Sequence, residues 1–356
     1  MDFQTRRDRL AARLPDLGVE ALFVTRLPNV RYLTGFTGSN GQVLVTPGGS
    51  IFLTDGRYTE QSRREVPDLK RGSYSADMAG AFVQACRDAA VSDVGFEAAG
   101  LTYRTYQQLS DADGFELMPV GLEVEQLRWV KDPDEIGLLD RAQAITDEAF
   151  ERILPKLVEG VIERDVALEL EWSMRQSGAE GVSFDSIVAF GESSAEPHHH
   201  PGDRELRPGD VVKMDFGALF QGYHADMTRT VAFGEPPREL REIHDLVRRA
   251  QEAGIEAVRA GVAGKEADAV SRDMIEEAGF GEAFSHSLGH GVGLEIHEGP
   301  TLRTNSDEVL PVGAVVTVEP GVYRPGLGGV RIEDMVEVTG DGCRVIGSST
   351  RELVIL

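Results

Sequence analysis

Apolar positions in the first third of the chain fall into short runs separated by polar residues, glycine and proline. Runs short enough for buried strands lie at residues 19–24, 43–45 and 51–53, and another begins at residue 94. Pro47-Gly48-Gly49 is typical of a hairpin turn, and residues 81–90 have a helical pattern. This mixture of strands and helices predicts a small α/β domain.

The pattern changes near residue 130, where a long helix is expected to begin. Asp132 suits the N-cap, Pro133 fits the first turn, and Asp134 and Glu135 suit its positive end. Apolar residues then recur at steps of three and four, at Leu138, Leu139, Ala142, Ile145, Ala149, Ile153 and Leu157. We therefore expect an N-terminal domain at residues 1–130 and a second domain at residues 131–356.

The second domain combines helical patterns with two similar pairs of strands. Helices are expected at residues 164–176, 240–258 and 266–278, and strand pairs at residues 211–216 with 225–233 and 315–318 with 330–338. In each pair one acidic residue ends the first strand, and another lies early in the second. This faint repeat predicts two related halves that close around one site.

The acidic residues of these strand pairs stand where a core would need hydrocarbon. They are Asp215, Asp226, Glu319 and Glu333. A buried ionised carboxylate is costly unless it is paired or binds a metal. Arg229 and Arg331 could neutralise two of the acids in a purely structural role, but that interpretation leaves the histidines unexplained.

Six of the eight histidines lie in two short segments, at residues 198–200 and 286–297. A run of three histidines alone is weak evidence for a site. The second segment has histidines at positions 286, 290 and 297, with glycines that would let a ligand approach closely. One imidazole with four carboxylates suits two divalent ions such as Mn²⁺, Co²⁺ or Zn²⁺. Cys86 and Cys343 lie elsewhere, so a thiolate site is not indicated.

Composition narrows the classes of function further. The net charge of −24 predicts a well-solvated protein and argues against a nucleic-acid partner, which needs a basic face. The chain contains no His-Glu-x-x-His, Walker loop or Gly-x-Ser-x-Gly motif. Two cysteines are too few for a disulfide framework, and no apolar run resembles a signal peptide or a transmembrane helix. The expected compartment is the cytoplasm, with no membrane partner.

The motifs together resemble the M24 metallopeptidase family, which has the pita-bread fold of prolidase, aminopeptidase P and methionine aminopeptidase. They are Pro197-His198, Met214-Asp215-Phe216-Gly217, residues 226–230 and 286–290, Glu319-Pro320-Gly321 and residues 331–334. Residues 29–36 and 54–58 resemble the extra domain of the proline-specific members. The resemblance implies an α+β pita-bread catalytic domain preceded by a smaller α/β domain similar to that of creatinase and prolidase.

The resemblance also implies a set of metal ligands. By position, Asp215 chelates one ion, Asp226 and Glu333 bridge the two ions, and His290 and Glu319 complete the ligand shell of the second ion. All five positions match the family, so a metal-free relative such as creatinase is not indicated.

Further residues acquire roles from the same resemblance. His198 and His297 correspond to histidines that contact the substrate and stabilise the transition state, and Glu319 is the candidate proton shuttle. His286 and Arg331 correspond to residues that line the substrate pocket or support the metal ligands.

The implied activity is hydrolysis of the bond between an N-terminal residue and a following proline, by a hydroxide that bridges two metal ions. We expect dipeptides to be preferred, because Arg31, Arg57 or Arg331 could pair with the substrate carboxylate. The alternatives are an aminopeptidase P that acts on longer peptides and, remotely, a non-catalytic pita-bread binding protein. A homodimer is expected, in which the N-terminal domain lies at the edge of the partner's site and residues 31–40 lie near the substrate.

Overall fold

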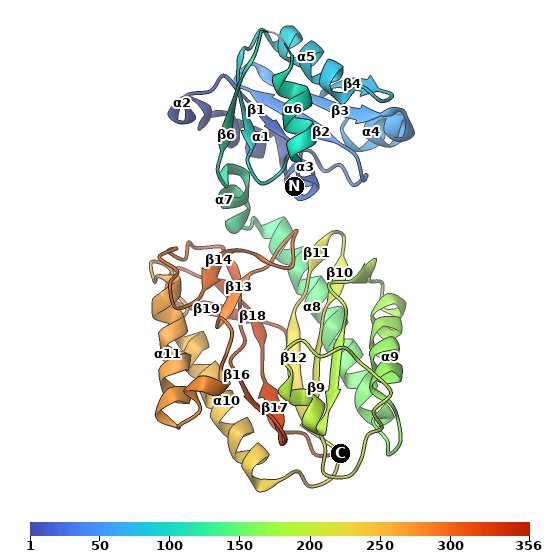
Figure 1. Ribbon diagram of the computed structural model, residues 1–356, viewed down its shortest axis with the longest axis vertical. Helices are drawn as coiled ribbons and strands as arrows, with labels where there is room; N and C mark the ends of the chain where they lie inside the picture. The colour runs from blue at the N-terminus through green and yellow to red at the C-terminus, as the bar shows by residue number, and fades with distance from the viewer. Residues whose placement is uncertain (113) are drawn as a thin grey trace. The chain divides into compact units, whose positions relative to one another are not determined.

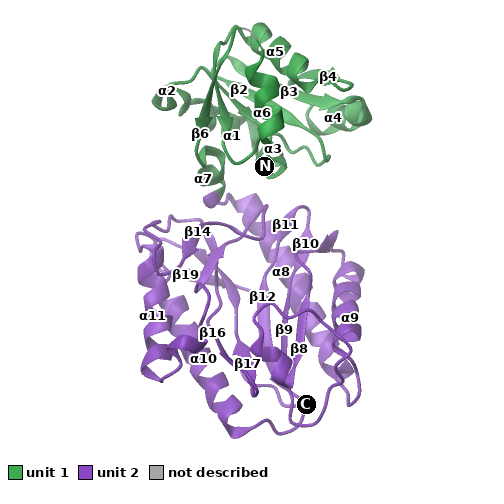
Figure 2. Cartoon of the chain, viewed as in Figure 1, with its two compact units in different colours: residues 1–128 green, residues 129–356 purple. Residues whose placement is uncertain are grey.

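The protein, described by a computed structural model over residues 1–112 and 114–356, divides into two compact units. The first unit is Met1–Arg128 and the second is Trp129–Leu356, and they are coloured separately in Figure 2. Among the described residues, no helix combines the length and the apolar character that a membrane crossing requires.

The first unit is built on a mixed six-stranded sheet in the order β4-β3-β2-β1-β5-β6 (Figure 1). Its strands are β1 (Ala21–Val24), β2 (Gln42–Thr46), β3 (Gly49–Asp55), β4 (Lys70–Tyr74), β5 (Asp93–Glu97) and β6 (Glu116–Val120). Its helices are α1 (Phe3–Ala11), α2 (Leu14–Leu17), α3 (Leu27–Thr34), α4 (Thr59–Glu65), α5 (Met78–Ala89), α6 (Tyr103–Ser110) and α7 (Glu123–Trp129), which crosses the division. β2 and β3 form the predicted antiparallel hairpin, with Thr46 opposite Gly49. Phe23, Leu44 and Phe82 are part of a core between α5 and the sheet.

The helices of the second unit are α8 (Pro133–Ile153), α9 (Glu163–Gln176), α10 (Arg238–Ala257) and α11 (Gly264–Glu277). The predicted start of α8 is confirmed. The Asp132 side chain accepts from the Glu135 amide at 2.9 Å, and the Glu135 side chain accepts from the Asp132 amide at 2.9 Å. This reciprocal capping box satisfies two amides that lack partners within the helix. The α-helix ends at Ile153, one turn before the last predicted apolar position.

Short antiparallel sheets lie between these helices (Figure 1). The first strands are β7 (Gly181–Val182), β8 (Ile187–Phe190), β9 (Val211–Phe216), β10 (Ala218–Phe220), β11 (Tyr223–His224) and β12 (Met227–Ala232). The later ones are β13 (Gly289–Gly291), β14 (Glu298–Leu302), β15 (Val315–Val318), β16 (Gly321–Arg324), β17 (Gly328–Arg331), β18 (Asp334–Val338) and β19 (Cys343–Ile346). The sheet orders are β11-β10-β7, β12-β9-β8, β14-β13-β15-β18-β19 and β16-β17.

The second unit consists of two halves, each with its own helices and core. In the first half α8 and α9 pack on β8, β9 and β12, and Phe150, Leu170 and Val212 lie in the shared core. In the second half α10 and α11 pack against the five-stranded sheet around Val247 and Val316. In Figure 1 α10 and α11 lie on the left of this unit and α9 on the right, with the strands between them. An α/β unit followed by an α+β unit agrees with the predicted fold class.

Two of the predicted strands are wrong in their bounds. The strand expected from residue 225 begins at Met227, so Asp226 lies just before β12. The strand expected at residues 330–338 is two strands, because β17 pairs with β16 whereas β18 pairs with β15. Glu333 lies between them, and its amide donates instead to the Thr228 carbonyl at 3.1 Å. Both departures place a carboxylate at a strand end rather than within a strand.

Candidate metal centre

A cavity of about 450 Å³ in the second unit is lined by residues from both halves. This volume is in the range of small-molecule sites. All nine site residues predicted from the sequence line it, namely His198, Asp215, Asp226, His286, His290, His297, Glu319, Arg331 and Glu333. The structure therefore brings together candidates from widely separated segments.

Strand ends place the predicted metal ligands. Asp215 lies near the end of β9, and Asp226 directly precedes β12, the strand paired with β9. His290 is the central residue of β13, Glu319 directly follows β15, and Glu333 lies between β17 and β18. The first half thus supplies two carboxylates, and the second half supplies the imidazole and the other two.

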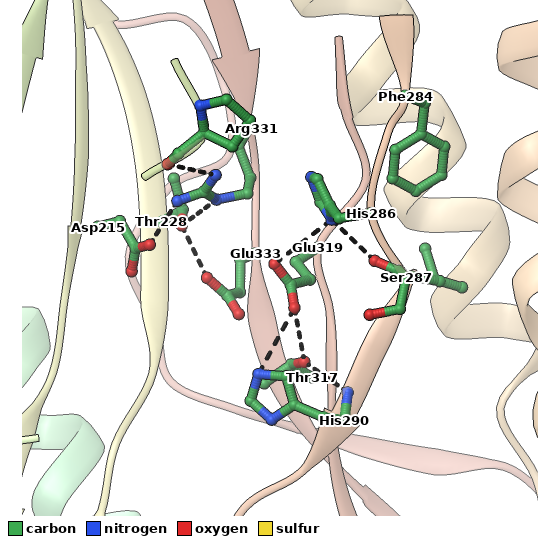
Figure 3. A network of polar contacts seen from close by, with 12 residues as sticks. Asp215, Thr228, Phe284, His286, Ser287, His290, Thr317, Glu319, Arg331 and Glu333 are labelled. Atoms are coloured by element: carbon green, nitrogen blue, oxygen red, sulfur yellow. Dashed lines mark hydrogen bonds and ion pairs between the residues drawn. The ribbon is translucent and has the colours of Figure 1, made fainter. Parts of the chain in front are cut away.

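His290 presents one ring nitrogen to this cluster. Its Nδ1 lies 3.0 Å from the Gly291 carbonyl, which can only accept, so Nδ1 carries the proton. The unprotonated Nε2 lies 3.5 Å from Glu319 Oε1 (Figure 3) and 3.5 Å from Asp226 Oδ2. Burial and nearby His297 lower the pKa of His290 to about 4, so the imidazole is neutral near pH 7. A backbone-oriented neutral imidazole is the form that binds metals.

The positive charge near the carboxylates of the cluster does not offset their burial and their mutual repulsion. Burial, with Glu333 as the next cause, raises the pKa of Asp226 and Glu319 well above the usual range. Burial and Asp215 raise the pKa of Glu333 to about 8. Asp215 Oδ1 is buried without a hydrogen-bond partner among the described residues. These features fit divalent ions, which would neutralise the acids and use the orphaned oxygen.

Geometry supports the same conclusion. Asp226, His290 and Glu333 each offer a ligand atom, and these atoms lie within 4.8 Å of one another. Thr228 Oγ1 donates to Glu333 at 2.7 Å, and Thr317 Oγ1 donates to Glu319 at 3.4 Å. Such hydroxyl groups fix the direction of a carboxylate and leave its other lone pairs for a metal.

Arg331 connects the acidic cluster to its surroundings. Its side chain is 3% exposed and forms an ion pair with Asp215. Nε donates to Thr228 Oγ1 at 2.9 Å (Figure 3). One terminal nitrogen donates to Tyr323 Oη at 2.7 Å. All three guanidinium nitrogens therefore contact protein groups. A substrate carboxylate would have to share these donors, so direct substrate binding by Arg331 stays a prediction.

A hydrogen-bonded chain leads from Arg331 to His286. Tyr323 Oη lies 2.8 Å from His286 Nε2, and His286 Nδ1 lies 2.8 Å from the Ser287 carbonyl. Nδ1 must donate to that carbonyl, so Nε2 accepts from the tyrosine hydroxyl. Burial and Arg331 lower the pKa of His286 to about 3, and burial raises the pKa of Tyr323 to about 12. The chain thus runs from the Arg331 cation through two neutral side chains, Tyr323 and His286, to the Ser287 carbonyl.

The remaining histidines lie at the wall of the cavity. The His297 ring centroid is 4.4 Å from that of His290, and burial lowers the pKa of His297. His198 is exposed, whereas His199 is half-buried and bonded to Glu163. His198 and His297 therefore line the cavity without belonging to the group of close ligand atoms.

Two interpretations of the sequence are corrected here. Arg229 neutralises none of the four acids, because it pairs with Asp334 at 2.6 Å. Gly289 and Gly291 serve strand packing rather than ligand approach. A Cβ at these positions would lie 1.9 Å and 2.2 Å from backbone oxygens of β15 and β14, respectively. Only glycine allows the strands to pair at this distance.

Sequence reasoning missed three polar residues that support the site. Tyr323 and Glu163 carried no distinguishing signal in their own segments. Lys213 carried such a signal, because it lies within the mostly apolar strand Val211–Phe216. Burying a cation there is as costly as burying a carboxylate. Burial and Arg331 lower the pKa of Lys213, and its Nζ lies within hydrogen-bond distance of three backbone carbonyls.

Comparisons with known proteins match both units. The family described as metallopeptidase family M24 matches residues 137–340, and the creatinase/prolidase N-terminal domain matches residues 6–130. An uncharacterized peptidase of Bacillus subtilis is 43% identical over 357 residues, which cover 98% of this chain and 99% of that protein.

Solved structures cover the chain to a similar extent. The Xaa-Pro dipeptidase from Bacillus anthracis has a TM-score of 0.97 and 42% identity, with 100% of both chains covered. The X-Pro aminopeptidase from Thermotoga maritima has a TM-score of 0.89 and 37% identity, covering 97% of this chain and 100% of that one.

Proposed function

The chain belongs to metallopeptidase family M24, and we propose that it hydrolyses the bond between an N-terminal residue and a following proline. The observation that carries this proposal is the largely buried group of four carboxylates and one imidazole at the cavity, in which one oxygen of Asp215 has no hydrogen-bond partner among the described residues. The likeness to an Xaa-Pro dipeptidase and an X-Pro aminopeptidase supports the choice of proline-containing substrates.

Within this proposal Asp215, Asp226, His290, Glu319 and Glu333 hold two divalent ions, of Mn²⁺, Co²⁺ or Zn²⁺. Bound ions of this kind polarise a carbonyl and lower the pKa of a coordinated water. The orientation of the ligands comes from the chain itself. The Gly291 carbonyl directs His290, and Thr228 directs Glu333.

The other cavity residues act on protons and charge. Glu319 Oε2 lies 4.0 Å from His286 Nδ1, and the carboxyl group is proposed to carry a proton to the leaving imino nitrogen. His198 and His297 are proposed to donate hydrogen bonds where negative charge develops on the carbonyl oxygen. The lowered pKa of His297 keeps this ring neutral, so it donates from a single N–H.

An apolar wall of the cavity suits the proline ring. Phe184, Ile187 and Ile296 line the same cavity as the histidines and the carboxylates. Burying a proline ring against them removes apolar surface from water without leaving an amide hydrogen unpaired, because proline nitrogen in a peptide bond carries none. A peptide bond to any other residue is a secondary amide, and its N–H would need an acceptor on this wall.

Dipeptides are proposed as the preferred substrates, in keeping with the likeness to the Bacillus anthracis dipeptidase. One observation favours the alternative of longer peptides. The Arg331 nitrogens already bind protein groups, and Arg57 pairs with Asp55 at 2.8 Å. A site that does not bind the carboxylate accepts a tripeptide as readily as a dipeptide.

The test compares kcat/KM for an aminoacyl-proline dipeptide, its C-terminal amide and a tripeptide with the same first two residues. The protein is first chelated and then supplied with Mn²⁺ or Zn²⁺. We expect the free dipeptide to be cleaved fastest. Equal cleavage of all three substrates would indicate an aminopeptidase P, and cleavage of none of them would contradict the proposed function.

We also propose a cytoplasmic homodimer. Both cysteines, Cys86 and Cys343, are free thiols, as is usual in a reducing compartment. The dimer rests on the resemblance to the family and is tested by sedimentation below.

A further inference from the structure

The segment that brings His198 to the cavity is fixed at its start by a buried lysine. Lys213 lies on β9 and is 0% exposed. Its Nζ lies 3.0 Å from the Ser194 carbonyl, 2.5 Å from the Glu196 carbonyl and 3.4 Å from the Pro197 carbonyl. One side chain thus contacts three carbonyl groups of the backbone that directly precedes His198.

The same segment is fixed at its end by a buried acid. Glu163 is the first residue of α9 and is 1% exposed. Its Oε2 accepts from His199 Nε2 at 2.8 Å and from the Gly202 amide at 3.0 Å. The other oxygen accepts from the Phe190 amide at 2.9 Å, which ties the segment to the end of β8.

We propose that Lys213 and Glu163 are positioning residues, which hold the 194–202 segment so that His198 meets the substrate carbonyl. The inference rests on the proposed function, because it assigns His198 to the reaction. His198 itself is exposed, so its placement depends on the backbone on either side of it.

Strand geometry explains why Lys213 is suited to this task. Residues 213 and 215 of β9 point to the same face, because side chains alternate along a strand. The same strand therefore carries both Asp215 of the metal cluster and Lys213, which binds the backbone carbonyls that precede His198. Arg331 adds a second link, since it binds both the Pro197 carbonyl at 3.3 Å and the Asp215 carboxylate. The distance between His198 and the metal ligands is thereby fixed by a few buried bonds.

A purely stabilising role for Lys213 gives a different result in a double-mutant cycle. Lys213→Met keeps the length and removes the donors. If Lys213 acts through His198, kcat should fall about 10²-fold, as expected when a catalytic group is displaced by about 1 Å. KM and metal content should change little. In the His198→Ala background, Lys213→Met should then lower kcat no further.

Two further variants complete the design. Val247→Ala creates a core defect in α10, away from the cavity, and shows that thermal destabilisation alone leaves kcat unchanged. Glu163→Gln removes the anionic acceptor at the other end of the segment and provides the same cycle if Lys213→Met does not fold. An unchanged kcat in the single variant would overturn the inference. Equal fold-losses of kcat with and without His198 would also overturn it.

Hydrogen exchange separates this inference from the proposed function. In Lys213→Met, amides of the 194–202 segment should lose protection, while those of α10 keep it. The proposed function fails if the wild-type protein cleaves no aminoacyl-proline substrate. The positioning role fails if protection of the 194–202 segment is unchanged in Lys213→Met.

Discussion

Metal-free protein should become less stable as the pH rises, because of the buried carboxyl group of Glu333. Burial and the neighbouring Asp215 raise the pKa of Glu333 from 4.5 to about 8. Between these values the folded protein keeps the proton, whereas the unfolded chain releases it. The contribution of Glu333 to stability is therefore fully present below pH 4.5 and is lost as the pH rises through about 8.

The magnitude follows from the pKa difference. The pKa of Glu333 rises from 4.5 to about 8 on folding, and each pH unit is worth about 1.4 kcal/mol. The free energy of unfolding above pH 8 should therefore be about 5 kcal/mol lower than below pH 4.5. In a unit of this length, each kcal/mol changes Tm by about 2–4 °C, so the expected fall is roughly 10–20 °C. Asp226 and Glu319 act in the same direction, since burial raises the pKa of both.

The assay is scanning calorimetry of chelated protein from about pH 5 to pH 9, with Glu333→Gln as the matched control. Glutamine is neutral at every pH, so the variant lacks the proton that Glu333 releases as the pH rises. The wild-type Tm should fall relative to the variant as the pH rises, and added Mn²⁺ should reverse the fall. Parallel Tm curves for the two metal-free proteins would refute the reasoning.

Three further predictions concern the site and the assembly. Chelation should abolish peptidase activity and a divalent ion should restore it, and Asp226→Ala or Glu333→Ala should lower the content of both ions. Full activity of protein shown by elemental analysis to be metal-free would contradict this. His198→Ala and His297→Ala should each lower kcat by ~10²–10³-fold with near-normal metal content, whereas metal loss in step with activity would show that they are ligands. Analytical ultracentrifugation should detect a homodimer, and a fully active monomer at working concentration would disprove it.

Local signals explain which parts of the fold were predictable. The start of α8 depends on Asp132, Pro133 and Glu135, which lie within four positions, so the sequence contains the whole capping pattern. The break at Glu333 depends on a bond from its amide to Thr228, far away in the chain. Residues 330–338, in which apolar and charged residues are mixed, therefore read as one strand, although tertiary pairing divides them.

The candidate site was predictable for a different reason. Acids within apolar runs are costly, so Asp215 and Glu319 were conspicuous, and the structure places both at one cavity. The same argument applies to Lys213, whose role became visible only with the three carbonyls around it. The glycines near His290 were misinterpreted, because the sequence does not tell a close strand from a close ligand.

The division of the ligand set between two separately packed halves has a consequence for fragment reassembly. The first half holds Asp215 and Asp226, and the second holds His290, Glu319 and Glu333. A chain cut between β12 and α10 would give two pieces, each with its own core and neither with the full set. Backbone bonds between Ala232 and the last residues of the chain would help the pieces dock. Divalent ions would then favour association of the two fragments, because only the associated pair offers all five ligands. Recovered peptidase activity would report that association.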